Sequence, residues 1–168
     1  MSKSTLKGMN FILTMGDNKV RTELSNQIIS LGGEVPSLIH PTAVISRFVK
    51  ISPIGVYISP ITYVQADSSI GDNTVLLSHV NISNTTNIGS SCFIAGGATI
   101  VAYTYNGGFC FCGSGRLSIS AKSKYIGNQA YICARNLLTR DIPANVVVVG
   151  NPCKVIRHIN KVLFSEKQ

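Results

Sequence analysis

Three histidines, His40, His79 and His158, are the side chains best suited to acid–base chemistry near neutral pH. A histidine can take a proton from a reacting group that lies within hydrogen-bond reach. We expect His40 at a junction and His158 on the surface, whereas His79 stands within the repetitive part of the chain, beside Ser78. Of the three, His79 is therefore the one that could take part in a site on the repeat. The alternative is a polar corner residue exposed to solvent or to a subunit contact, because a lone histidine is seldom catalytic.

Five cysteines are the other candidates for chemistry: Cys92, Cys110, Cys112, Cys133 and Cys153. Their odd number, and the inward repeat positions of two of them, favour buried reduced thiols. Cys110 and Cys112 form a C-x-C pair, but there is no second pair and no histidine at zinc-ligand spacing nearby. The sequence therefore predicts no metal site.

A hydrophobic ladder with a period of six residues indicates which structural elements hold these side chains in place. Its clearest rungs are Ile70, Leu76, Ile82, Ile88, Ile94 and Ile100, and small or β-branched residues stand two positions before each: Ser68, Thr74, Val80, Thr86, Cys92 and Ala98. Neither an α-helix nor a flat strand has this period. It is the hexapeptide pattern of a parallel β-helix, in which each side of a triangular coil takes roughly six residues and one aliphatic side chain points inward. The predicted fold class is therefore all-β.

The ladder extends beyond these rungs in both directions: Ile45, Ile51 and Val64 lie upstream, and Cys112, Ile119, Ile126, Ile132 and Leu138 lie downstream. Asn106 breaks it, inside the stretch from Tyr103 to Gly108. We therefore expect a loop to leave the coil at this point. Such an excursion is a common place for a binding site in a repeat protein.

The ladder divides the chain into three parts: an N-terminal segment over 1–39, the β-helix over 40–152 and a C-terminal segment over 153–168. In the first part, residues 10–15 and 35–39 read as short strands on either side of a helix that ends at two glycines. Such a strand–helix–strand unit is typical of the edge of an α/β nucleotide-binding domain. In the last part, apolar residues at helical spacing predict a short C-terminal helix.

The composition excludes several classes of function. With 168 residues, 45% of them apolar, the chain can bury a substantial core as one globular unit with a small appendage. It has no apolar run of the roughly 20 residues needed to cross a bilayer, and MSKSTLKG lacks the apolar segment of a secretory signal. We therefore expect a cytoplasmic protein without membrane insertion. The net charge of +8 comes from lysines and arginines that are scattered along the chain, and no nucleic-acid-binding module is present. A polyphosphate cofactor would be bound by such a distribution as well as nucleic acid would.

Three further stretches, MGDNKVRTELSNQI, LIHPTAVIS and RDIPANVVVVGNPCKVIR, flank or end the ladder. Together with the ladder, they make nearly the whole chain resemble the hexapeptide-repeat acyltransferases, and within them the sialic acid O-acetyltransferase and bacillosamine-type amino-sugar N-acetyltransferase group. The resemblance implies a left-handed parallel β-helix and a homotrimer. It also implies acetyl-CoA in the groove between neighbouring subunits, and a sugar or nucleotide-sugar acceptor near the N-terminal segment.

The resemblance also implies where the active site lies, and the sequence departs from the family there. The catalytic histidine of the family corresponds to Asn84 and its acidic partner to Thr85. Asparagine cannot act as a general base at neutral pH. His79, five residues earlier, is the candidate for a displaced base. The family's glycine-rich turn for nucleotide phosphates has no counterpart in this sequence.

The family's contacts with the cofactor fall, by the same resemblance, on Phe93, Ala102, Gly113, Ser114 and Ala134. Gly113-Ser114-Gly115 allows a close approach to the backbone. The alternative is that these glycines only satisfy the geometry of a corner.

Two functions remain open on the sequence. The first is an acetyl-CoA-dependent acyltransferase that acts on an amino sugar or a sialic-acid-like sugar of a surface-polysaccharide pathway. Positioning alone can carry part of such a reaction, because a deprotonated amine is already nucleophilic. The second is a catalytically silent β-helix trimer with a structural or partner-binding role.

Overall fold

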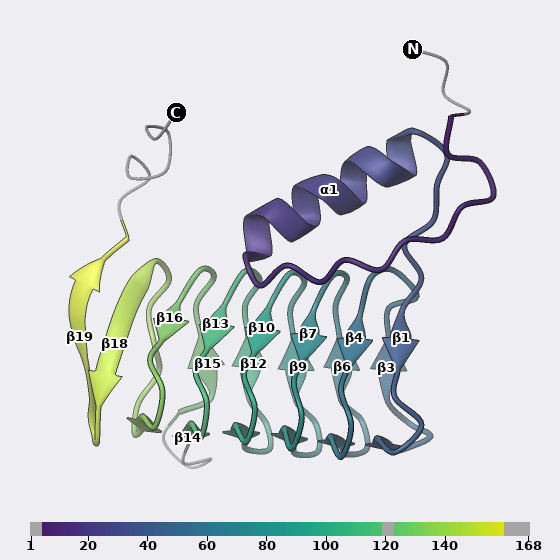
Figure 1. The fold of residues 1–168 in the computed structure, drawn as a ribbon. Helices are drawn as coiled ribbons and strands as arrows, with labels where there is room; N and C mark the ends of the chain where they lie inside the picture. Colours follow the sequence, from purple (N-terminus) through teal and green to yellow (C-terminus); the bar gives the residue numbers. More distant parts are fainter. Residues whose placement is uncertain (1–4, 119–122, 160–168) are drawn as a thin grey trace.

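The computed structural model describes residues 5–118 and 123–159, and most of them form a β-solenoid of stacked triangular coils (Figure 1). Phe93 pairs with Val75 of the coil before it and with Phe111 of the coil after it, so these coils are 18 residues apart. All strands that stack along the solenoid are parallel. The predicted parallel β-helix is confirmed.

Three sheets form the sides of the coils. Sheet 1 contains β1 (Leu38–Ile39), β4 (Tyr57–Ile58), β7 (Val75–Leu76), β10 (Phe93–Ile94), β13 (Phe111–Cys112), β16 (Tyr131–Ile132), β18 (Val146–Gly150) and β19 (Cys153–His158). Sheet 2 contains β2 (Val44–Ile45), β5 (Tyr63–Val64), β8 (Asn81–Ile82), β11 (Thr99–Ile100), β14 (Leu117–Ser118) and β17 (Leu137–Leu138). Sheet 3 contains β3 (Lys50–Ile51), β6 (Ser69–Ile70), β9 (Asn87–Ile88), β12 (Tyr105–Asn106) and β15 (Tyr125–Ile126).

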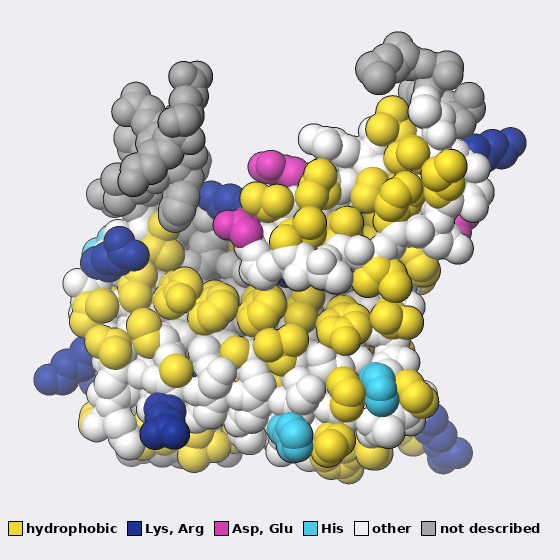
Figure 2. Space-filling model, in the orientation of Figure 1, with side chains coloured by type: hydrophobic (Ala, Val, Ile, Leu, Met, Phe, Trp, Pro, Cys, Tyr) yellow, Lys and Arg dark blue, Asp and Glu magenta, His cyan; other side chains and the backbone are white. Residues whose placement is uncertain are grey.

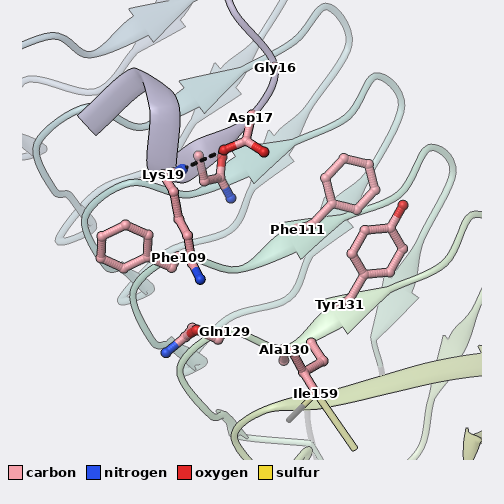
Figure 3. Close-up of a pocket in the computed structure, with 10 residues that line it drawn as sticks. Gly16, Asp17, Lys19, Phe109, Phe111, Gln129, Ala130, Tyr131 and Ile159 are labelled. Atoms are coloured by element: carbon pink, nitrogen blue, oxygen red, sulfur yellow. Dashed lines mark hydrogen bonds between the residues drawn. The ribbon is translucent and has the colours of Figure 1, made fainter. Parts of the chain in front are cut away.

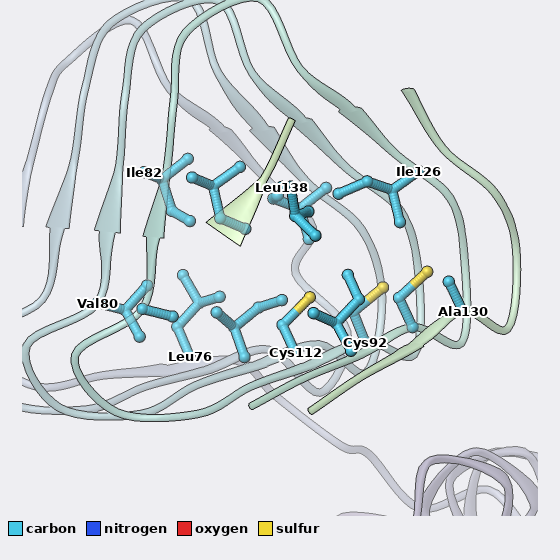
Figure 4. Packing of buried hydrophobic residues seen from close by; sticks show 14 of the residues in the cluster. Leu76, Val80, Ile82, Cys92, Cys112, Ile126, Ala130 and Leu138 are labelled. Atoms are coloured by element: carbon cyan, nitrogen blue, oxygen red, sulfur yellow. The ribbon is translucent and has the colours of Figure 1, made fainter. Parts of the chain in front are cut away.

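The rungs of the ladder form one continuous apolar column inside the solenoid (Figure 4). The second residue of each short strand points inward, and Ile82, Ile94 and Ile100 have no exposed surface. The first residue of each strand points outward because side chains alternate across a strand. One rung from each side of every coil therefore supplies the core, as the period of six predicts.

The corners between the sheets require an unusual backbone conformation. We call them corner 1–2, corner 2–3 and corner 3–1 after the sheets they join. One residue at each regular corner has a positive φ, as His79 (61°), Thr85 (53°) and Ser91 (60°) do in one coil. This left-handed conformation costs roughly 1–2 kcal/mol for a residue other than glycine. The corner amides offset part of that cost, because they donate to the preceding coil, as Ser91 N does to Asp72 O at 2.7 Å.

Small polar side chains reinforce the corners from the inside. The Thr74 hydroxyl donates to Gly89 O at 2.9 Å, and the Thr86 hydroxyl donates to Val101 O at 3.1 Å. Both side chains are buried, and both stand two positions before a rung. These residues satisfy carbonyls of the next coil that would otherwise be buried without a partner.

Asn106 does not start a loop, contrary to the prediction from the broken ladder. It lies on β12, its side chain is completely buried, and its Nδ2 donates to Gly107 O at 3.2 Å and to Cys92 Sγ at 3.5 Å. The core tolerates this amide because the carbonyl of the next residue and the Cys92 thiol of the preceding coil supply partners. The irregular coil lies further on: Ile88 and Asn106 are 18 residues apart, whereas Asn106 pairs with Ile126, 20 residues away. The predicted rung at Ile119 lies outside the described residues.

A buried cation lies in the same part of the core. Arg116 is 1% exposed, and its Nη1 donates to Cys112 Sγ at 2.8 Å, whereas its Nε and Nη2 have no hydrogen-bond partner among the described residues. Burial raises the pKa of the Cys112 thiol to about 11, and the nearby guanidinium opposes this shift only in part. Both features make these coils less apolar than the coils before them.

The predicted C-terminal helix is wrong over its described residues. Cys153–His158 forms β19, which pairs antiparallel with β18 after a tight turn at Asn151 and Pro152. Val155 and Ile156 have β-branched side chains that favour an extended backbone. Cross-strand hydrogen bonding to the end of sheet 1 therefore overrides the helical spacing. Residues 160–168 of that prediction lie outside the described part of the chain.

The N-terminal segment covers part of the solenoid with a single helix, α1 (Asn18–Ser30), which confirms the predicted helix (Figure 1). Asp17 caps it, accepting bonds from Lys19 N and Val20 N at 2.9 and 3.0 Å. The flanking strands expected over 10–15 and 35–39 are reduced to a parallel bridge between Asn10 and Glu34 and to β1, which belongs to sheet 1.

Helix α1 contacts the solenoid through its polar face. Arg21 is 1% exposed and donates from Nε to Asn73 O at 3.0 Å and from Nη2 to Cys92 O at 3.1 Å. Asn18 Nδ2 donates to Cys110 O at 3.1 Å. These bonds join the start of the helix to three successive coils at corner 3–1.

Gly89 is required by the stacking of the coils, and we predict that Gly89→Ala destabilises the protein. A Cβ at Gly89 would lie 2.7 Å from Gly108 N and 2.8 Å from Gly107 C, both backbone atoms. Overpacking of this kind costs about 2 kcal/mol, which lowers Tm by about 4–8 °C in a chain of this size. At the control position, Gly16, a Cβ meets nothing closer than Phe93 Cε2 at 3.9 Å. Equal melting temperatures for Gly89→Ala and Gly16→Ala, by circular dichroism, would contradict the prediction.

Thiol reactivity tests the burial of the cysteines. Four are buried, and Cys133 alone among the five is partly exposed. Only a thiolate attacks a disulfide reagent, and burial raises the pKa of the Cys112 and Cys153 thiols. With Ellman's reagent at pH 8 we expect at most one thiol to react quickly in the native protein, and all five after denaturation. A Cys133→Ser variant should lose the fast reaction. Rapid reaction of several native thiols would show that the core is open.

Candidate functional site

His79 lies at corner 1–2, where the structure gives it an exposed position and a positive φ. Its ring has no hydrogen-bond partner among the described residues of the chain. The neighbouring Ser78 O accepts a bond from Gly97 N of the next coil at 3.1 Å. The imidazole is thus accessible to an acceptor, but no group in this chain orients it.

Asn84 lies at a different corner of the same coil, corner 2–3. It is half-buried, its Nδ2 donates to Thr85 Oγ1 at 3.3 Å, and its carbonyl accepts from Tyr103 N at 3.3 Å. Strand β8 of sheet 2 separates Asn84 from His79. The two predicted catalytic positions are therefore not brought together within one chain.

The predicted cofactor residues divide in the same way. Ser114 and Ala134 are exposed at corner 1–2, two and three coils beyond His79, and the carbonyl of Ser114 accepts from Arg135 N at 2.8 Å. Coils stack about 4.8 Å apart, so Ser114 lies roughly 10 Å from His79 along that corner. Ala102 lies at corner 2–3, next to Asn84 in the stack. Phe93 lies on the outer face of sheet 1.

The two glycines near Ser114 have a structural explanation. A Cβ at Gly113 would lie 2.5 Å from Ala134 N, so the stacking of the next coil excludes any side chain there. Gly115 has a φ of +63°, which suits the corner. Both therefore satisfy the corner, and a role for Gly113 in holding a cofactor remains a prediction.

The outer face of sheet 1 carries a groove that the sequence reasoning missed. Aromatic rings of successive coils stack there: Phe93 on Phe111 with centroids 5.6 Å apart, and Phe111 on Tyr131 at 4.5 Å. Figure 2 shows hydrophobic side chains in a row across this face, beneath the N-terminal segment. The sequence does carry a signal for this groove: aromatic residues recur at the position directly before a rung, as Phe93, Phe111 and Tyr131 do.

The groove has two hollows beneath the N-terminal segment, which meet at Gly16. One is lined mostly by apolar side chains, including Ile12, Tyr57 and Phe93. The other combines Phe109, Phe111 and Tyr131 with polar groups, and Figure 3 shows it from close by. Both hollows lie between the outer face of sheet 1 and the N-terminal segment.

Neither a metal site nor a membrane span is found in the described part of the chain. Over residues 5–118 and 123–159, His, Cys, Asp and Glu form no group of three or more that could hold a metal ion. Among the same residues, no helix has the length and apolar character needed to cross a membrane.

Comparisons with known proteins agree with the fold. A scan of protein-family models finds no match. Among curated proteins, galactoside O-acetyltransferase from Escherichia coli (strain K12) is 54% identical over 35 residues, which cover 21% of this chain and 17% of that protein. The chain thus matches about a sixth of the length of this relative.

Two solved structures are similar over most of the chain. The acetyltransferase domain of PglB from Neisseria gonorrhoeae FA1090, in complex with acetyl coenzyme A, has a TM-score of 0.83 and 25% identity, covering 88% of this chain and 70% of that one. A histidine-to-asparagine mutant of perosamine N-acetyltransferase from Caulobacter crescentus, in complex with CoA and GDP-perosamine, has a TM-score of 0.79 and 24% identity, covering 89% and 70%. With its ladder of hexapeptides, the chain is thus similar in fold to these acetyltransferases and shares their β-solenoid.

Proposed function

We propose that the protein is an acetyl-CoA-dependent acyltransferase that modifies the amine, or else a hydroxyl, of an amino sugar or sialic-acid-like sugar in a surface-polysaccharide pathway. The observation that carries the proposal is the likeness, over 88% of the chain, to an acetyltransferase domain in complex with acetyl coenzyme A. The neighbour in complex with CoA and GDP-perosamine supports an amino-sugar acceptor, bound as a nucleotide-sugar.

Corner 1–2 is the surface that we propose for the cofactor. Ser114 and Ala134 are exposed on it in consecutive coils, and the corner backbone runs straight along the stack. An extended ligand such as the pantetheine arm fits a surface of this kind, because each coil repeats the same spacing. His79 lies on the same line, where the reacting end of the cofactor would meet the acceptor. Gly113 lies on the same corner and keeps its predicted contact. Ala102 lies at corner 2–3, so its predicted contact would come from a neighbouring copy of the chain, and Phe93 lies on the outer face of sheet 1, away from this line.

The reaction needs little from the protein beyond positioning and a proton acceptor. Bound acetyl-CoA supplies an activated thioester carbonyl. His79 would accept the proton that the acceptor nitrogen loses as its bond to the acetyl carbon forms, and would return that proton to the sulfur as the carbon–sulfur bond breaks. Asn84 would hold a substrate oxygen or amine through its amide, since it cannot take a proton.

A homotrimer would bring the two corners together. His79 and Asn84 lie on different corners of one chain, so a groove between two copies could combine corner 1–2 of one with corner 2–3 of the other. Exposed apolar side chains on the outer faces of sheets 2 and 3, including Val44, Tyr63 and Tyr105, support association of the chain with itself. We also propose a cytoplasmic location, where acetyl-CoA is available.

The silent-scaffold alternative is not favoured. The solved neighbours named above are acetyltransferases by description, and they were crystallised with CoA or acetyl coenzyme A. Asn84 and Thr85, which stand where the resemblance places a histidine and an acidic residue, are the features that would suit a scaffold.

Substitution of His79 tests the proposed base. We predict that His79→Asn lowers kcat by about 100-fold with little change in KM for acetyl-CoA, because general-base catalysis contributes at least this much. The assay is chromatographic detection of CoA released with a panel of amino sugars and nucleotide-linked amino sugars. His158→Asn is the control, because His158 is exposed on β19, away from corner 1–2.

A double variant separates the two corners. If Asn84→His in the His79→Asn background restores the rate, a base at corner 2–3 also reaches the acceptor, and the two corners belong to one site. An unchanged rate in His79→Asn alone would show that the assignment of the base to His79 is wrong, although the transferase activity stands. Absence of CoA release by the folded wild-type protein with every acceptor would count against the enzyme itself.

A further inference from the structure

Arg116 is a buried charged residue that neither the fold nor the proposed site explains. It stands directly before β14 at corner 1–2, where Val80 stands directly before β8 and Ala98 directly before β11, and all three are buried. Its guanidinium therefore lies inside the solenoid, beside Cys112 of the apolar column (Figure 4). A long cation thus occupies a position that takes a small apolar side chain in the two preceding coils.

Arg21, which is also buried, shows by contrast how a guanidinium is satisfied in this protein. Each of its nitrogens donates to an oxygen, at distances from 2.7 to 3.1 Å. Arg116 donates only from Nη1, to Cys112 Sγ at 2.8 Å, and its Nε and Nη2 have no partner among the described residues. These two nitrogens lie on the same edge of the planar guanidinium, and their N–H groups form the fork that holds an anion by two parallel hydrogen bonds.

No buried acidic side chain accompanies Arg116 in the part of the chain that the structure describes. Over residues 5–118 and 123–159, no Asp or Glu is buried, and residues 119–122 read ISAK, which contains no acid. Burial raises the pKa of the adjacent Cys112 thiol to about 11, so this group is uncharged at neutral pH. A water molecule would accept both N–H bonds without neutralising the charge, and an uncompensated charge inside a protein is strongly destabilising. A buried anion would meet both needs at once.

We propose that Arg116 binds a single halide ion, with chloride as the abundant one, inside the solenoid through its Nε–H and Nη2–H groups. Coils stack about 4.8 Å apart and protein cores are close-packed, which favours a monatomic ion over a polyatomic one such as phosphate. Chloride carries one charge and neutralises the guanidinium, whereas sulfate or phosphate would bury an excess of negative charge. The ion would be a structural part of the irregular coil, so the inference does not depend on the proposed function.

Melting temperatures at constant ionic strength test the site without any need for turnover. When sodium chloride replaces sodium gluconate, we expect a saturable rise in Tm of about 3–6 °C once chloride reaches about ten times its Kd. Arg116→Met should abolish this rise, because methionine has a similar length but no charge and no N–H donor. General effects of salts on apolar burial persist in the variant, so the difference between the two proteins reports the site.

Two further variants make the test independent of one substitution. Arg135→Met is the matched control and should keep the full chloride response, since Arg135 is exposed in the next coil of corner 1–2. Arg116→Lys keeps the charge but loses the fork, and should weaken chloride binding about tenfold. Arg116→Met is expected to fold, because replacement of a buried charge by an apolar side chain of similar size is often neutral or stabilising.

Anomalous diffraction from crystals grown in bromide locates the ion directly. We expect a bromide peak within hydrogen-bond distance of both Nε and Nη2 of Arg116. Bromide peaks at the surface alone would indicate an adventitious ion only and would overturn the proposal. So would a chloride response of equal size in wild type and Arg116→Met, or no response in wild type. If, in that last case, Cys112→Ser removes the ultraviolet absorbance of a thiolate at neutral pH, Cys112 is the group that neutralises Arg116.

Discussion

The structure depends on the stacking of successive coils at hydrogen-bonding distance. Each short strand donates to the coil after it, as Phe93 N does to Cys110 O at 2.9 Å, and this repeats around all three sides. The spacing leaves no room for side chains where backbones meet, which explains Gly89 and Gly113. It also forces positive φ angles at the corners, even on His79 and Thr85. The stacking of the coils, and not a ligand, thus determines the backbone conformation of the residues in the candidate site.

The same constraint governs how the N-terminal segment is attached. A helix could have packed on the solenoid through its apolar side, yet α1 is joined to it by Arg21 and Asn18, which donate to backbone carbonyls of three coils. Cys92 O and Cys110 O accept these bonds in addition to one backbone N–H each, because a carbonyl oxygen has two lone pairs. Removal of one partner of a buried, charge-assisted bond costs more than loss of a surface contact. Arg21 therefore determines where the groove under the N-terminal segment lies.

Much of this could be predicted from the sequence, because a period of six residues specifies both the coil and the direction of each side chain. The inward positions of Ile82, Ile94 and Cys112 follow from it directly. The prediction failed where tertiary partners override a local pattern. Asn106 finds polar partners inside the core, and Cys153–His158 pairs with the end of sheet 1 although its spacing suggested a helix.

The site was less predictable than the fold. Counting along the repeat places Ser114 and Ala134 on one corner with His79, and Ala102 with Asn84 on another. Counting cannot show whether two corners meet, because that depends on a second copy of the chain. The groove under α1 was missed because it joins Lys19 to Phe109, 90 residues apart, through the packing of a helix whose buried face is polar.

The central claim is that the solenoid presents an acetyl-CoA site built from more than one copy of the chain. Calorimetric titration of the purified protein with acetyl-CoA, with light scattering on the same sample, tests it most directly. The account predicts a trimer that binds about one acetyl-CoA per chain. A well-folded trimer that binds no acetyl-CoA would contradict it, and so would a monomer that binds acetyl-CoA as tightly as a trimer does.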